Sequence, residues 1–190
     1  MKILFINACI RDDKSRTLAL AIYFISKYKA KYNDVKVDEI DLGKENIKPL
    51  LNKELKERDF FVNNKVYNDK MFNYAKQFSK ADKIIIASPC WDYSFPSILK
   101  VYIENICVLG ITFKYDFKGS IGLSMFDSLL YITTVGGYDY NNDYIRTITK
   151  FLGKGKYHEI CVKGLDIFGN NEKEILDKAY DELDKMVEVF

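Results

Sequence analysis

The chain has 190 residues, of which 48% are hydrophobic and 29% charged, and its formal net charge at neutral pH is +2. This length suits one domain, and we expect residues 1–190 to fold as a single domain with a substantial core. No segment approaches 18 uninterrupted apolar residues, so we expect neither a membrane span nor a disordered chain. Positive and negative side chains are interspersed, which gives nucleic-acid binding little support.

The cysteine and histidine content indicates a reducing environment and no metal site. Four cysteines lie far apart, without any C-x-x-C element, and the single histidine, His158, has no neighbouring ligand. Widely spaced cysteines in apolar surroundings are typical of reduced thiols. The apolar stretch 3–6 is too short for the core of a signal peptide, so we expect a cytoplasmic protein.

Short apolar runs rich in Ile, Val, Phe and Tyr predict four strands that are buried on both faces of a parallel sheet. They cover residues 2–7, 83–88, 129–135 and about 158–164. A fifth run, 35–42, is more polar and only partly alternating, which favours a strand at an edge.

Helical patterns lie between these strands. One apolar stripe consists of Leu18, Ile22, Ile25 and Tyr28, and another of Ile175, Ala179, Leu183, Met186 and Phe190. Further helices are expected over 70–80, 97–108 and 142–152. Residues 43–70 are the least readable, and their apolar island Phe60-Phe61-Val62 packs on the core or forms a surface contact, with packing favoured.

Strands that alternate with helices predict an α/β fold, a doubly wound five-stranded parallel sheet with helices on both faces. With the second strand at an edge, the expected strand order is 2-1-3-4-5. The winding then reverses between strands one and three, and ligands bind outside the carboxyl ends of the strands at such a point.

The loop after strand one, residues 7–17, is the first candidate for ligand binding. Ser15 or Thr17 is expected to cap the following helix, whose free amides and dipole suit a phosphate. Arg16 would add a charge-assisted hydrogen bond. Taken alone, this loop favours a simpler interpretation, in which Ser15 only caps the helix and Arg16 is only solvated. Asp12 and Asp13 would oppose a phosphate if they pointed inward.

Two other loops are expected to meet the first one. Residues 88–96 follow strand three and supply flat apolar surfaces at Trp91, Tyr93 and Phe95, which suit an aromatic ligand or a plug in the core. Residues 133–138 follow strand four and contain Gly136-Gly137, where backbone can approach a ligand closely, although ordinary turns use such pairs too. The three loops together predict one ligand site at the sheet edge.

The order of these motifs resembles a known family. The motifs are Ser88-Pro89-Cys90-Trp91-Asp92-Tyr93-Ser94-Phe95-Pro96, Leu99-Lys100, Tyr102-Ile103-Glu104, Gly110-Ile111-Thr112-Phe113-Lys114-Tyr115, Gly119, Gly122-Leu123 and Gly136-Gly137. In this combination the chain resembles the FMN-dependent NADH azoreductases and NAD(P)H quinone reductases, which have a flavodoxin-like fold. The resemblance extends over the whole chain.

The resemblance implies an oxidoreductase that passes hydride from NADH or NADPH through FMN to a quinone, azo or nitro compound by double displacement. It also implies a homodimer, with Phe113 and Tyr115 on the substrate side near the partner subunit. The flavin itself does the chemistry, so no side chain is expected to be an obligatory acid or base. The residues implied to bind FMN are Cys9, Ser15, Arg16, Thr17, Pro89, Cys90, Trp91, Asp92, Tyr93, Thr134, Gly136 and Gly137.

Two positions depart from the family pattern, and two alternatives stay open. Cys9 stands where serine is frequent, and Asp92 stands where asparagine is usual, so that its carboxylate would disfavour anionic reduced flavin. The alternatives are an electron carrier of the same fold and a flavin-free binding protein. Carriers are strongly acidic, whereas this chain has a pI of about 8.2. A phosphorylated receiver would need an aspartate at the end of strand three, where Ser88-Pro89 stands.

Overall fold

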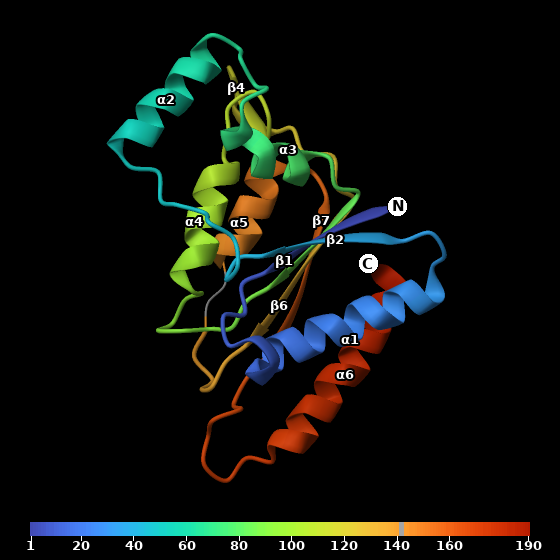
Figure 1. Cartoon of the computed structure of the whole chain (residues 1–190). Coiled ribbons are helices and arrows are strands. Elements are labelled where there is room, and N and C mark those ends of the chain that lie inside the picture. The colour runs from blue at the N-terminus through green and yellow to red at the C-terminus, as the bar shows by residue number, and fades with distance from the viewer. Residues whose placement is uncertain (141–142) are drawn as a thin grey trace.

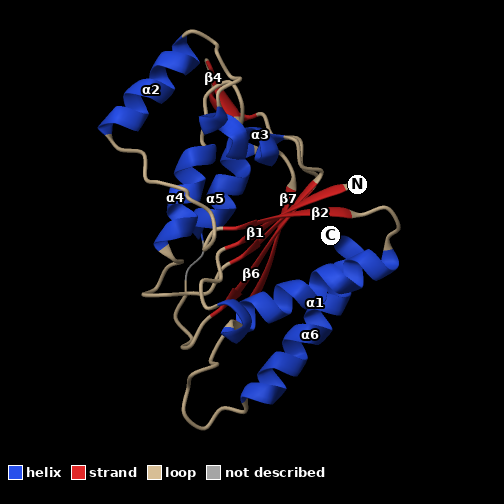
Figure 2. Cartoon of the chain, in the orientation of Figure 1, coloured by secondary structure: helices blue, strands red, loops and turns tan. Residues whose placement is uncertain are grey.

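The computed structural model describes residues 1–140 and 143–190 (Figure 1). Five parallel strands form one sheet in the order β2-β1-β3-β6-β7, which crosses the middle of the molecule between layers of helices (Figure 2). These strands are β1 (Lys2–Asn7), β2 (Lys36–Asp41), β3 (Lys83–Ala87), β6 (Ser128–Thr134) and β7 (Lys156–Val162). The predicted five-stranded parallel sheet of an α/β fold is thereby confirmed.

Helices cover both faces of this sheet. On one face lie α1 (Arg16–Lys31) and α6 (Glu172–Val189), and on the other lie α3 (Asn73–Ser79), α4 (Ser97–Ile106) and α5 (Asp143–Leu152). The predicted helix over 142–152 corresponds to α5, and its residue 142 lies outside the described residues. Two short 3-10 helices, η1 (Asp12–Lys14) and η2 (Lys70–Phe72), precede α1 and α3.

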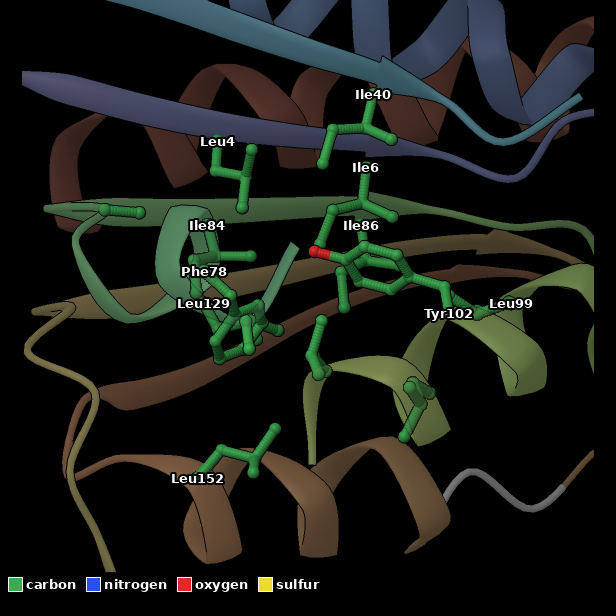
Figure 3. Packing of buried hydrophobic residues seen from close by; sticks show 14 of the residues in the cluster. Leu4, Ile6, Ile40, Phe78, Ile84, Ile86, Leu99, Tyr102, Leu129 and Leu152 are labelled. Atoms are coloured by element: carbon green, nitrogen blue, oxygen red, sulfur yellow. The ribbon is translucent and has the colours of Figure 1, made fainter. Parts of the chain in front are cut away.

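The strands divide the core into two layers because successive side chains of a strand point to opposite faces. Leu4 and Ile6 of β1 pack with Tyr102 of α4 on one face, which Figure 3 shows from close by. Ile3 and Phe5 pack with α1 and α6 on the other face. The central strands β1, β3 and β6 are thus held between apolar layers, as their near-continuous apolar runs predicted, whereas the more polar β2 lies at an edge of the sheet, also as predicted.

A hairpin absent from the sequence prediction changes the numbering of the strands. β4 (Phe113–Asp116) and β5 (Gly119–Gly122) pair antiparallel with each other in a separate two-stranded sheet. The fourth and fifth predicted strands are β6 and β7, so the numbering 2-1-3-4-5 does not describe the whole chain. β5 begins and ends with glycine and has no alternating apolar pattern, whereas β4 alternates as Phe-Lys-Tyr-Asp over only four residues, the shortest run that such a pattern can identify.

The stripe predicted for the first helix is confirmed only in part, since Tyr28 is buried and Leu18 and Ile25 pack against the core. Ile22 is 55% exposed, whereas Leu20, Ala21 and Phe24 are fully buried against the sheet. The apolar positions of α1 form two adjoining stripes, and periodicity alone does not tell which of them faces the sheet. In α6, the predicted stripe is closer to the observed one, because Ala179 and Leu183 are buried.

Residues 43–70, whose sequence shows no clear pattern, contain a helix, α2 (Asn52–Asn63), in which no residue is buried. Phe61 and Val62 pack against the core, whereas Phe60 is 63% exposed. Both interpretations of the apolar island therefore hold for part of it. Among the described residues, no helix has the length and apolar character needed to cross a membrane.

Candidate functional site

A cavity of about 430 Å³ lies where β1, β3 and β6 end. Eight of the residues that the sequence proposed for a ligand site line it, together with four that it did not propose. The first group is Ser15, Arg16, Thr17, Pro89, Cys90, Trp91, Thr134 and Gly136, and the second is Arg11, Lys14, Asp166 and Glu172. The predicted meeting of the three loops at one place is thus observed.

The amino terminus of α1 forms one wall of the cavity. Ser15 caps the helix, since its Oγ accepts a hydrogen bond of 3.3 Å from the backbone N–H of Leu18. The Thr17 hydroxyl is buried and lies 2.6 Å from the Thr134 hydroxyl, which ties the first loop to the third. The first-turn amides of a helix have no acceptor within it, so this wall is suited to an anion.

Cys9 does not line the cavity. Its side chain is 3% exposed, and its thiol donates a hydrogen bond of 3.5 Å to the carbonyl oxygen of Ala87. Burial raises the pKa of this thiol to about 12, although a hydrogen bond with Ser15 acts in the other direction. Cys9 is therefore a neutral residue that packs between β1 and β3.

The aromatic loop after β3 contains a tight turn that the sequence did not reveal. Trp91 and Ser94 exchange two backbone hydrogen bonds of 2.8 Å each. Between them, Asp92 and Tyr93 have φ angles of 51° and 62°, the left-handed values of a type I′ turn. Such turns favour Asn and Gly at these positions, so Asp-Tyr gives little signal. The turn leaves Tyr93 80% exposed.

A second cavity of about 300 Å³ adjoins the first and shares Cys90 and Gly136 with it. Asp92, Tyr93 and Gly137 line this second cavity. The predicted site residues after β3 and β6 are thereby split between two connected spaces. The backbone N–H of Cys90 donates a hydrogen bond of 2.9 Å to the carbonyl oxygen of Thr134, which fixes the two loops relative to each other.

The two glycines of the third loop have different surroundings. A Cβ atom on Gly136 would lie 2.4 Å from Oδ2 of Asp166, whereas a Cβ on Gly137 would meet nothing within 4 Å. The close approach that the sequence predicted at Gly136 is thus made by a side chain of the same protein. Gly137 is open on this side and lines the second cavity.

The loop between β7 and α6 and the first residue of α6 supply two of the four residues that the sequence interpretation missed, Asp166 and Glu172. Nη2 of Arg16 lies 2.7 Å from Oδ1 of Asp166, and Nη1 lies 3.2 Å from Oε1 of Glu172. Burial by itself lowers the pKa of Arg16, but the hydrogen bonds with these two carboxylates raise it. Arg16 is therefore ion-paired rather than merely solvated. The strand order could have indicated these residues, because the loop after the last parallel strand starts at the same edge of the sheet as the other loops of the site.

Phe113 and Tyr115 lie away from the cavity of their own chain. Figure 1 shows the hairpin beside α3, at the far end of α4 from the loop of residues 88–96. The Phe113 ring packs against Phe151 with centroids 4.6 Å apart, and Tyr115 is 66% exposed. One chain by itself does not bring these two aromatics to the cavity.

Metal-ligating side chains do not gather anywhere in the described part of the chain, where no group of three or more His, Cys, Asp or Glu residues could hold an ion. The half-buried Cys90 has its pKa raised mainly by burial, which disfavours a thiolate there. The cavity thus offers hydrogen-bond donors, cations and a flat aromatic side chain.

Comparison with known proteins places this geometry in a family. A model of proteins with a flavodoxin-like fold matches residues 1–187. An FMN-dependent NADH:quinone oxidoreductase of Clostridium beijerinckii is 37% identical over 95% of this chain and 94% of its own length. Another protein of that name, from Clostridium perfringens, is 34% identical over 100% of this chain and 99% of its own length.

Solved structures agree with the sequence comparison. The crystal structure of an FMN-dependent NADH-azoreductase from Bacillus anthracis, in complex with FMN, superimposes with a TM-score of 0.85 at 25% identity. The match covers 99% of this chain and 98% of that one. The chain therefore belongs to the family of proteins with a flavodoxin-like fold. Its relatives in this family are named FMN-dependent NADH:quinone oxidoreductases.

Proposed function

We propose that the protein is an FMN-dependent oxidoreductase that passes hydride from NADH or NADPH through FMN to a quinone, azo or nitro acceptor. The observation that carries this proposal is the meeting of the α1 amino terminus, the Trp91 loop and the Thr134–Gly136 segment around one cavity. The names of the relatives support the same activity.

The residues present fit FMN. The first-turn amides of α1, with Ser15 and Thr17, form a set of donors for a phosphate, and Arg16 and Lys14 supply positive charge beside them. Trp91 supplies a flat apolar surface for an aromatic ring, and Arg11 lies over it with its guanidinium carbon 5.5 Å from the ring centroid. The cavity thus has a polar end, which suits the phosphate of FMN, and an aromatic end, which suits its ring.

Most of the residues proposed to bind FMN line the main cavity or the one that adjoins it. Ser15, Arg16 and Thr17 hold the phosphate and ribityl chain, and Pro89, Cys90 and Trp91 lie along the flavin ring. Asp92 and Tyr93, which line the adjoining cavity, continue the wall along the ring. Thr134, Gly136 and Gly137 hold its pyrimidine side. Cys9 contributes by packing beneath this site, since its thiol is turned to Ala87.

When bound, FMN supplies the hydride-transfer chemistry, taking two electrons from the nicotinamide and giving them to the acceptor. The chain's own residues bind and orient the participants. In this proposal, donor and acceptor use the side near the exposed Tyr93 and Gly137 one after the other, which gives double-displacement kinetics. No side chain in the cavity needs to act as an obligatory acid or base.

Assembly and location follow as further parts of the proposal. Residues 1–190 act as one domain in a homodimer, in which Phe113 and Tyr115 of one chain cover the cavity of the other. The exposure of Tyr115 and its distance from the cavity of its own chain support this arrangement. The four free cysteines support a cytoplasmic location.

Titration of the purified apo-protein with FMN tests the proposal. We expect stoichiometric uptake, a flavin absorbance spectrum and a rise in melting temperature, since the ligand binds only the folded state. Initial rates with NADH and a quinone should then give parallel lines in a double-reciprocal plot. A protein that takes up no flavin would refute the proposal. Flavin uptake without reduction by NADH or NADPH would instead favour an electron carrier.

A further inference from the structure

The loop between β7 and α6 is fixed against the third loop by its backbone. Gly164 donates a hydrogen bond of 2.8 Å to the carbonyl oxygen of Gly137, and Asp166 donates one of 3.0 Å to that of Gly136. The missing Cβ of Gly136 leaves room for the Asp166 carboxylate. Asp166 is therefore held in the cavity wall from two sides, by backbone bonding and by close packing.

The side chains of this wall reach across to α1. Besides its bonds to the carboxylates of Asp166 and Glu172, Nη1 of Arg16 donates a hydrogen bond of 3.3 Å to the carbonyl oxygen of Leu165. We call Asp166, Arg16 and Glu172 the clasp. The clasp joins segments that lie far apart in the sequence, since Arg16 and Asp166 are 150 positions apart.

The clasp also sets the charge at one end of the cavity. Two carboxylates line that end beside the Ser15 and Thr17 wall. Both carboxylates pair with the one guanidinium of Arg16, so the clasp itself carries two negative charges against one positive charge. The helix amides can offset the charge of one phosphate, whereas a second phosphate would add to the repulsion from Asp166 and Glu172. Like charges placed together at a binding site cost several kcal/mol and serve to reject the wrong partner.

We propose that the clasp makes the site selective for flavin mononucleotide, because it closes the phosphate end of the cavity and repels the second phosphate of a flavin dinucleotide. This inference rests on the proposed FMN site and names the residues that determine its cofactor class. Asp166 and Glu172 are specificity-determining residues that act on the ligand directly by charge and on Arg16 by holding its orientation.

The test compares the affinities for FMN and FAD by quenching of flavin fluorescence. The variants are Asp166→Ala/Glu172→Ala, which opens the wall, and Asp166→Asn/Glu172→Gln, which removes only its charge. Glu174→Gln is the matched control, since Glu174 lies two residues after Glu172 on α6, does not line the cavity and forms an exposed ion pair with Lys178. Thermal melting verifies that each variant is folded.

In the wild-type protein, FMN should bind more tightly than FAD. This preference should fall by about tenfold or more in the charge-removing variant, further in the open variant, and not at all in the control. Equal affinities in the wild type, or a preference that survives both double variants, would overturn the role of the clasp while the proposed function stands. A wild-type protein that binds neither flavin would overturn both. If the open variant does not fold, the isosteric variant decides.

Discussion

Helices α1 and α2 both follow strands of the sheet, but they are integrated into the molecule in opposite ways. α1 has a capped amino terminus, five buried residues and one end in the candidate site. α2 has no side-chain cap and no buried residue, and in Figure 1 it projects outward toward the same end as β4. The walls of the cavity are thus built within one chain, whereas the α2 and hairpin end exposes Phe60, Tyr115 and Phe117, of which Tyr115 is proposed to cover the cavity of the partner chain.

The largest expected effect concerns the packing of α1. Phe24→Ala should lower the free energy of unfolding by about 3–5 kcal/mol, since it removes a fully buried ring between the sheet and Phe190. Ile22→Ala, on the exposed side of the same helix, should cost less than about 1 kcal/mol. Urea denaturation measures both. Equal losses would mean that the burial of α1 is not as the structure describes.

The next effect concerns the site at the amino terminus of α1. Ser15→Ala should weaken FMN binding by about 10- to 150-fold, since a hydrogen bond to a charged group is lost, and riboflavin should be little affected. Ser15→Thr keeps a hydroxyl and should retain most of the affinity. Isothermal titration with both ligands measures this. If the alanine variant weakens both equally, Ser15 serves only as the helix cap.

The next prediction concerns the exposed α2 and hairpin end, where we propose that two chains assemble. Light scattering should give a mass twice the chain mass of 22.2 kDa. Replacing Tyr115 and Phe117 together by lysine should raise the dissociation constant of the dimer by about tenfold or more, since exposed aromatics are typical anchors of interfaces. Phe168→Lys, a fully exposed aromatic on the β7–α6 loop, is the control and should leave the mass unchanged. A monomeric wild-type protein with full activity would contradict the shared site.

The smallest effect concerns charge in the turn at residues 91–94. Asp92→Asn should raise the reduction potential of bound FMN by about 20 mV, because it removes roughly 1 kcal/mol of repulsion in a solvent-exposed position. Asparagine tolerates the left-handed conformation of this position, so folding should be unaffected. Spectroelectrochemistry measures the potential, with Asp177→Asn on α6 as the control. An unchanged potential would place the Asp92 carboxylate away from the flavin ring.

Much of the site could be predicted because its residues follow strands that the sequence marks clearly. Ser15 and Trp91 follow short apolar runs and Thr134 ends another, and parallel strands bring such positions to one edge. Cys9 also follows β1, but its side chain alternates to the face of α1 and is buried there. The sequence therefore predicted that Cys9 follows β1, but not to which face of the sheet its side chain points.

By itself, the sequence determined the parallel sheet, its edge strand and the three loops at its carboxyl edge, because these depend on local runs of apolar residues and on chain order. Only the tertiary structure decided which stripe of α1 faces the sheet, that residues 113–122 form a hairpin, and that Arg16 meets Asp166 and Glu172. These features depend on contacts between segments far apart in the chain. No local pattern of residues encodes such contacts, since each partner by itself is an ordinary charged or apolar side chain.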